Sequence, residues 1–151
     1  MPNWCNNNIT IRAPKKKLDK IVKAAKKGEL LNHFLPMPKE LDGTTADGSK
    51  DKAMIKKTGY SDWYSWAVDN WGTKWITPTP IDEVHETELI NLSNDKESLA
   101  IEFANQSAWA PPYELISYIC KTYNLRGSCR WHEEGGNADW GHFDNKGELV
   151  S

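Results

Sequence analysis

The sequence predicts an α+β fold in which amphipathic helices pack on one antiparallel sheet. Three observations support this prediction. Apolar and polar residues alternate over 8–12, 99–103 and 126–132, a pattern typical of half-buried strands. Apolar residues spaced three and four apart follow Pro14 and Pro112, as they do in amphipathic helices. Segments rich in Asn, Asp and Gly lie between these elements and favour turns.

The first strand, 8–12, leads directly into a helix. Pro14 suits the first helical position, where its missing N–H costs little. Gly28 follows two lysines and is expected to end the helix. The apolar face of this helix consists of Leu18, Ile21, Val22 and Ala25, and lysines occupy the other faces.

Residues 29–80 are predicted to form a tryptophan-rich, partly helical insertion after the first helix. Within it, 42–59 is rich in Gly, Thr, Asp, Ser and Lys and is predicted to be a flexible loop. Ser61 is predicted to cap a short helix that runs to Asn70 and ends at Gly72.

An antiparallel hairpin is predicted after the insertion. Its strands cover 84–92 and 99–103, and turn residues at 94–96 separate them. A second helix then begins at the paired prolines 111–112. Its apolar side chains recur at helical spacing, at Leu115, Ile116, Ile119 and Tyr123.

Two strands complete the predicted sheet, at 126–132 and 138–143, with a glycine turn at 135–137 between them. The first of these strands places Arg126, Ser128, Arg130 and His132 on one side and Gly127, Cys129 and Trp131 on the other. The resulting order is that of a ferredoxin-like βαββαβ sandwich with an additional C-terminal strand. We therefore expect a single ferredoxin-like domain over 1–151.

The distribution of charge and the number of cysteines indicate the kind of protein and its cellular compartment. The net charge of −2 conceals an asymmetry, because residues 1–39 carry nine basic and two acidic side chains. This layout either steers a partner electrostatically or reflects a solvated, lysine-rich helix face. The three cysteines are widely spaced and suit free, buried thiols in a reducing compartment. With no signal peptide or spanning segment in the sequence, we expect a soluble protein of the bacterial cytoplasm.

Tryptophan is concentrated in one segment, since four of the eight tryptophans lie between Trp63 and Trp75. Such a cluster forms either part of a core or an exposed recognition platform. We expect a core cluster that closes one end of the sheet, formed by Trp4, Trp71, Trp75 and Trp109, and we expect Trp63 to be exposed. In the competing interpretation, Lys74 and the neighbouring indoles line a ligand pocket.

The residues that most resemble a chemical site are His132, Glu133, Glu134, Asp139 and His142. Two histidines with carboxylates suit a divalent metal, but their spacing is not that of a known zinc motif. His132, Asp139 and His142 are therefore weak metal candidates. We expect no metal, no cofactor and no catalytic residues.

Four short motifs resemble those of a known family. They are MPNWCNN at 1–7, WGTKW at 71–75, FANQSAWAPP at 103–112 and EEGG at 133–136. In this order they resemble the YubB-type ferredoxin-like proteins of bacteriophages and conjugative plasmids, and the resemblance extends from end to end of the chain. It implies an accessory protein of a mobile element and supplies no catalytic residues.

We therefore expect a non-enzymatic accessory protein that binds or regulates a host or mobile-element protein. The candidate binding residues are Trp63, Trp66, Trp71, Gly72, Lys74, Trp75 and Trp109. The alternative is a module for single-stranded nucleic acid or nucleotides that uses the sheet, Lys74 and the lysine-rich first helix. Its candidate phosphate contacts are Lys16, Lys20 and Lys23.

Overall fold

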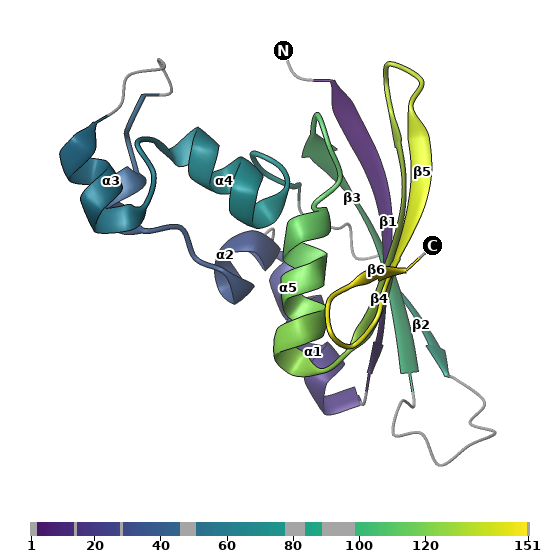
Figure 1. Cartoon of the computed structure of the whole chain (residues 1–151). Coiled ribbons are helices and arrows are strands. Elements are labelled where there is room, and N and C mark those ends of the chain that lie inside the picture. The colour runs from purple at the N-terminus through teal and green to yellow at the C-terminus, as the bar shows by residue number, and fades with distance from the viewer. Residues whose placement is uncertain are drawn as a thin grey trace.

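The computed structural model describes residues 3–13, 15–27, 29–45, 51–77, 84–88 and 99–150. Figure 1 shows a sheet with helices on one side. The strands are β1 (Trp4–Ala13), β2 (Val84–Glu88), β3 (Leu99–Ala108), β4 (Arg126–Glu133), β5 (Ala138–Phe143) and β6 (Leu149–Val150). The helices are α1 (Lys15–Lys26), α2 (Leu30–Phe34), the 3-10 helix η1 (Lys39–Leu41), α3 (Lys52–Thr58), α4 (Trp63–Trp71) and α5 (Tyr113–Tyr123).

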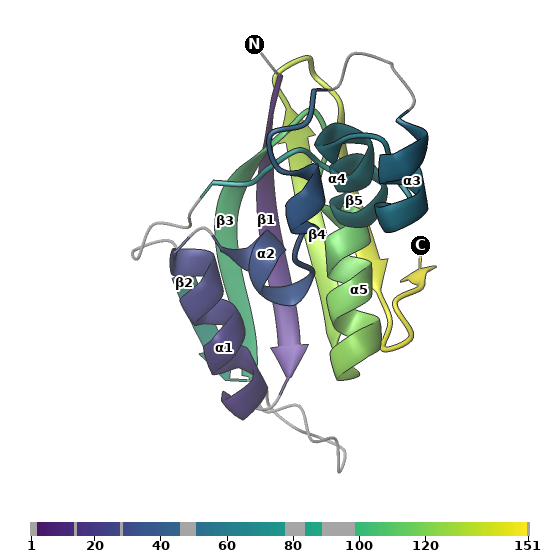
Figure 2. The same ribbon diagram turned by 90° about the vertical axis from the view of Figure 1, so that its left-hand side faces the viewer.

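The sheet has the strand order β2-β3-β1-β4-β5-β6, and each described pair of neighbouring strands is antiparallel. The chain places β1 between β3 and β4 (Figure 2). The register sets Ile9 between Phe103 and Cys129. The predicted ferredoxin-like α+β fold and its additional C-terminal strand, β5, are confirmed. The two-residue strand β6 lies beyond β5 and was not predicted.

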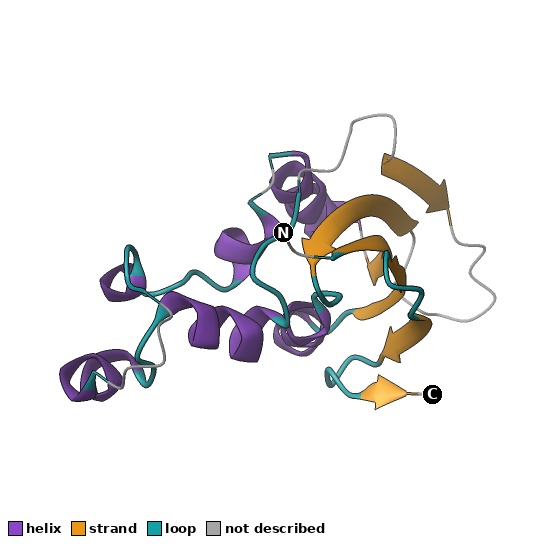
Figure 3. Ribbon diagram, turned by 90° about the horizontal axis from the view of Figure 1, so that it is seen from above, coloured by secondary structure: helices purple, strands orange, loops and turns teal. Residues whose placement is uncertain are grey.

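The core lies between the sheet and its helical layer. Ile9 and Ile11 of β1 are buried, and Ile21 and Ile116 contribute from α1 and α5. Alternate residues of β1 point away from the helices, and two of them, Asn8 and Arg12, are exposed. Figures 1 and 3 show that every helix in the described ranges lies on the same side of the sheet.

Two local predictions in the insertion were wrong. Residues 42–59 do not form one flexible loop, because 52–58 form α3. The Asp51 carboxylate accepts the Met54 N–H at 3.1 Å, and Gly59 ends the helix with φ 86°. For the next helix, the cap is Asp62 rather than Ser61.

Strand ends differ from the predictions in β1 and β3, and the strand predicted at 99–103 continues to Ala108. The first strand begins at Trp4, four residues before the predicted start at Asn8, because polar side chains of this stretch are buried and bonded to one another. The hairpin strand predicted at 84–92 is seen at 84–88, and 89–92 lie outside the described residues.

Asp62 begins α4, and we expect Asp62→Ala to cost about 1 kcal/mol of unfolding free energy at pH 7. The Asp62 carboxylate accepts the Ser65 N–H at 2.8 Å, and this bond is the main cause that lowers its pKa. A lowered folded pKa gives stability above the unfolded pKa of about 4, and that stability is lost as the pH falls through the folded value.

Urea unfolding at pH 7 and pH 3 measures this contribution. The difference between the parent protein and Asp62→Ala should shrink at pH 3. Asp51→Ala is the matched control, since it removes the cap of α3, a helix with no buried residues, and should cost less. An equal loss in both variants would contradict the assigned role of Asp62.

The three cysteines are free and buried, as predicted. Burial raises the pKa of Cys5 to about 11 and that of Cys120 to about 12. The pKa of Cys129 is also raised, chiefly by burial. These thiols therefore stay protonated at neutral pH and are poor nucleophiles. In the described part of the chain, no helix has the length and apolar character needed to cross a membrane.

Candidate binding site

All four motifs meet at one end of the molecule. The Trp109 N–H donates to the Asn3 carbonyl at 2.8 Å, and the Glu134 N–H donates to the Trp4 carbonyl at 3.1 Å. The hydroxyl of Thr73 donates to the Ala108 carbonyl at 2.8 Å and lies 3.1 Å from the Ala108 N–H, which donates to it. Segments distant in sequence thus form one junction between the sheet, α4 and α5.

The WGTKW segment forms a tight turn against the start of α5. Gly72 ends α4 with φ 83°, a conformation that strains other residues. A Cβ at this position would lie 3.2 Å from the Pro111 carbonyl oxygen and from the backbone nitrogens of Tyr113 and Glu114. Gly72 is therefore a packing residue, and it lets the chain turn from α4 toward β3.

Trp71 is a core residue, as predicted. Its side chain is 4% exposed, and its ring meets that of Trp66 edge to face with centroids 5.1 Å apart. The Trp71 indole N–H donates to the Leu35 carbonyl at 2.8 Å, which ties α4 to the end of α2. Both tryptophans stabilise the fold and are too buried to contact a partner.

Trp75 lies at the surface beside Trp4. The two ring centroids are 6.3 Å apart, and Trp75 is 37% exposed. The Lys74 ammonium lies 5.2 Å from the centroid of the Tyr64 ring and 5.5 Å from that of Trp75. Both distances are within the range of cation–π attraction.

Trp109 corrects the predicted core cluster. Its side chain is 48% exposed, and the predicted grouping of Trp4, Trp71, Trp75 and Trp109 in one core does not form. The reason is the backbone, which holds Trp109 at φ 71°. The Ala110 N–H donates to the Ala108 carbonyl at 2.9 Å across it, so Trp109 is the centre of a strained γ-turn.

A network of buried polar side chains connects this turn to the interior of the sheet through hydrogen bonds. Asn7 donates through Nδ2 to Asn105 Oδ1 at 3.0 Å and to Ser107 Oγ at 2.9 Å. Ser107 in turn donates to the Ala110 carbonyl at 2.6 Å. Among the described residues, Asn105 Nδ2 has no hydrogen-bond partner. The network joins the interior of the sheet to the turn that holds Trp109.

We call the surface formed by Trp4, Lys74, Trp75 and Trp109 the tryptophan end. Trp63 is not the exposed residue that we expected, because it is half-buried and packs against the core, with Tyr64 edge to face at 6.0 Å. The tryptophan end therefore contains three of the seven predicted binding residues.

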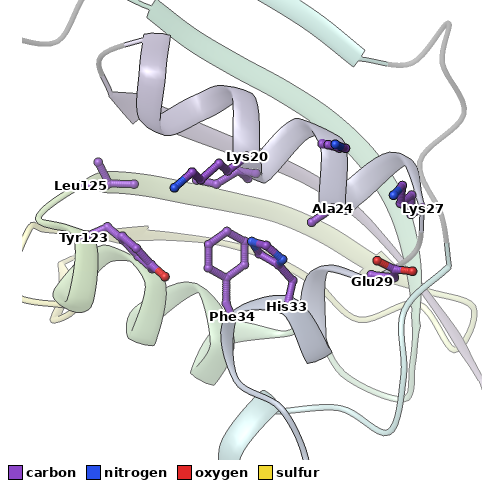
Figure 4. A pocket seen from close by; sticks show the side chains of 10 residues that line it. Lys20, Ala24, Lys27, Glu29, His33, Phe34, Tyr123 and Leu125 are labelled. Carbon is purple, nitrogen blue, oxygen red and sulfur yellow. The ribbon is translucent and has the colours of Figure 1, made fainter.

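A groove lies on the helical side, away from the tryptophan end. It has a volume of about 910 Å³, and α1, α2 and the end of α5 form its walls. Figure 4 shows Phe34 and His33 beside the cavity, facing Lys20 of α1. The Phe34 ring also meets that of Tyr123 edge to face at 5.4 Å. Lys20 and Lys23, two of the predicted phosphate contacts, line this groove.

The predicted nucleic-acid surface is divided between two faces. Helix α1 carries Lys16, Lys20 and Lys23 and lies on the covered side of the sheet. The other side of the sheet faces away from α1. The predicted surface is thus split between the uncovered side of the sheet and helix α1 on the covered side (Figure 2).

The weak metal candidates also lie apart. The β4–β5 register pairs Trp131 with Asp139, whereas His132 pairs with Ala138 and His142 with Ser128. His132 and His142 share one face of the sheet near opposite ends of this pair, and Asp139 points to the other face. The described residues include no group of three or more His, Cys, Asp or Glu side chains placed to hold a metal ion.

The fold and these sites define a ferredoxin-like α+β protein. The family model for the ferredoxin-like domain in Api92-like protein matches residues 88–150. The crystal structure of the protein Api92 from Yersinia pseudotuberculosis is similar in fold, with a TM-score of 0.53 and 12% identity over 99% of this chain and 96% of that chain. No curated protein matches the chain in sequence.

Proposed function

We propose that this chain is a non-enzymatic accessory protein of a phage or plasmid, and that it binds a host or mobile-element protein through the tryptophan end. The mobile-element origin rests on the four sequence motifs, which resemble those of the YubB-type proteins of bacteriophages and conjugative plasmids. The binding role rests on one observation. Trp109 is 48% exposed, and its backbone is held in a strained conformation.

Strain at an exposed tryptophan favours recognition over packing. A non-glycine residue at positive φ costs about 1–3 kcal/mol, and this residue still leaves 48% of its surface exposed. Tryptophan contributes strongly to protein interfaces because it buries a large rigid surface. Trp75 adds a second exposed ring. Lys74, beside that ring, offers a cation, so the partner segment that fits is apolar with a carboxylate.

Affinity purification of the tagged full chain from plasmid-bearing cells identifies the partner, and calorimetry with the purified partner measures the interaction. Trp109→Ala and Lys74→Glu should each raise the dissociation constant at least tenfold, a loss of about 1.4 kcal/mol. Both variants should unfold at the same urea concentration as the parent protein, within about 0.5 kcal/mol.

Trp140→Ala is the matched control. Trp140 is 55% exposed and lies on β5, on the face of the sheet away from the helices. This variant should bind the partner as the parent protein does. Unchanged affinity in Trp109→Ala, or an equal loss in Trp140→Ala, would contradict a binding role for the tryptophan end.

The groove supports a second candidate function, the binding of a nucleotide. The observation that favours it is that Lys20, Lys23 and Phe34 all line the groove, with Lys20 across from the ring of Phe34 (Figure 4). Its volume, about 910 Å³, is within the usual range for small-molecule sites. Lysine ammonium groups suit phosphates, and an aromatic ring suits a base.

Titration with ATP tests this second function. A variant with both Lys20→Glu and Lys23→Glu should lose ATP binding. The control variant carries Lys52→Glu and Lys56→Glu on α3. It makes the same change of charge away from the groove and should keep ATP binding. No heat of binding at 1 mM ATP would remove this candidate.

A further inference from the structure

We propose that the sheet face away from the helices binds single-stranded nucleic acid, with backbone phosphates on Arg12, Arg126 and Arg130 and a base on the ring of Trp140. This surface uses none of the residues of the tryptophan end or of the groove. We call it the open face. It contains none of the lysines that the sequence suggested as phosphate contacts. Trp4 of the tryptophan end lies at one end of the same face, because it alternates with the buried Cys5 along β1.

The strand register gathers basic residues on the open face. Residues directly opposite one another on neighbouring strands point to the same side of a sheet. Arg12 lies opposite Arg126, and Asn8 lies opposite Arg130. Arg12, Arg126 and Arg130 are all exposed. In the strands that the structure describes, Glu102 is the one acidic residue on this face.

Arg12 lies directly opposite Arg126 in the β1–β4 register, so two like charges are neighbours on this face. Like charges directly opposite each other destabilise an antiparallel pair. Arg130 extends the basic row, because four residues along β4 correspond to about 13 Å. Arginine is the side chain best suited to phosphate, through its planar fork of N–H donors. The row therefore suits a phosphate backbone that runs along β4.

A cavity lies at the start of this row. It has a volume of about 310 Å³, and Arg12, Arg126, Ser128 and His142 line it. Asp144 also lines it, and its Oδ1 accepts the N–H groups of Lys146 and Glu148 at 2.9 Å. That carboxylate is thus engaged in the turn that leads to β6. The two arginines leave the cavity with a net positive charge.

Trp140 provides a stacking surface beside the arginines. It is 55% exposed and lies directly opposite Arg130. Its ring lies against that of His142, with centroids 4.1 Å apart and an interplanar angle of 61°. This contact supports the ring from one side. An exposed aromatic ring on a sheet binds an unpaired base, and stacking of this kind contributes about 1–3 kcal/mol per base.

The combination favours a single strand over a duplex. In a duplex the bases are stacked on one another, so the ring of Trp140 would have no base to meet. Arginines alone would bind either form through its phosphates. Preference for the single strand is therefore the property that separates a stacking site from a basic patch.

Fluorescence anisotropy with labelled oligonucleotides tests the proposal on the full-length protein. The probes are a 12-residue oligo(dT), a 12-residue oligo(rU) and a 12-base-pair duplex, each at 50 and 200 mM salt. We expect one or both single strands to bind more tightly than the duplex, and the affinity to fall with salt. The two single strands distinguish DNA from RNA as the ligand.

The variants assign the binding to residues. Trp140→Ala should weaken oligonucleotide binding about tenfold. Arg130→Glu should weaken it at least as much and reduce the dependence on salt. Both positions are exposed, so circular dichroism and the urea midpoint should match those of the parent protein. Arg130→Gln removes the charge alone and should have a smaller effect.

Two controls keep this proposal separate from the proposed function. The variant with Lys20→Glu and Lys23→Glu changes charge on the helical side, and Trp109→Ala removes an exposed ring from the tryptophan end. Both should bind the oligonucleotides within twofold of the parent protein. Absence of binding at 50 mM salt would overturn the proposal. Equal binding of the duplex, or equal losses in the controls, would also overturn it.

Discussion

Trp71→Ala is expected to destabilise the protein by about 3–5 kcal/mol. The Trp71 ring is almost completely buried and packs edge to face against Trp66. The substitution removes this contact and leaves a cavity. It also leaves the Leu35 carbonyl without the indole donor, 2.8 Å away, that joins α4 to α2. Denaturant unfolding measures the loss.

Two further variants separate packing from hydrogen bonding at this position. Trp71→Phe keeps an aromatic ring but lacks the N–H, so it should recover part of the loss. Trp140→Ala removes a tryptophan that is 55% exposed and should cost less than about 1 kcal/mol. A Trp71→Ala protein within 1 kcal/mol of the parent would show that Trp71 is not part of the core.

Asn7→Ala is expected to cost about 3 kcal/mol, an unusually large loss for a polar residue. Asn7 is 2% exposed and donates to Asn105 and Ser107 inside the sheet. Within the described part of the chain, both polar atoms of the Asn105 amide would then lack a partner, since Asn105 Nδ2 has none there already. Buried polar groups without partners are costly.

Asn8→Ala is the matched control for this loss. Asn8 is the next residue along β1 and is exposed on the open face. Its replacement should change the unfolding free energy by about 0.5 kcal/mol or less. Equal effects at the two positions would mean that the buried network contributes nothing. Ser107 also donates a hydrogen bond to the Ala110 carbonyl, in the turn that holds Trp109. Asn7→Ala should therefore weaken partner binding as well.

The sequence predicts the order of the elements because periodicity depends on which side of an element is buried. Ile9 and Ile11 alternate with polar residues along β1, and Ile21 and Ala25 recur at helical spacing in α1. Both patterns correspond to buried faces in the structure. The start of β1 could not be predicted in this way, because a buried Asn7 has the same polarity as an exposed one.

The positions of the tryptophans could not be predicted from their spacing. Trp71 and Trp109 occur in similarly short motifs, yet one is buried and the other is largely exposed. Their difference depends on the γ-turn at Trp109, and a positive φ at a tryptophan has no signature in the sequence. The arginine row did have a signature, since alternation in 126–132 places Arg126 and Arg130 on one side. The missing information was Arg12, which only the register brings opposite Arg126.

The position of β1 determines the order in which the protein can be assembled during synthesis. This strand is made before both of its neighbours, β3 and β4, which begin at residues 99 and 126. The buried hydrogen bond from Asn7 to Ser107 cannot form until Ser107, 100 residues further along the chain, has been synthesised. The matched segment 88–150 contains β3 and β4 but not the strand that lies between them. Expressed alone, that segment would have two strands with no shared neighbour, so the smallest unit that can close this sheet includes the N-terminal strand.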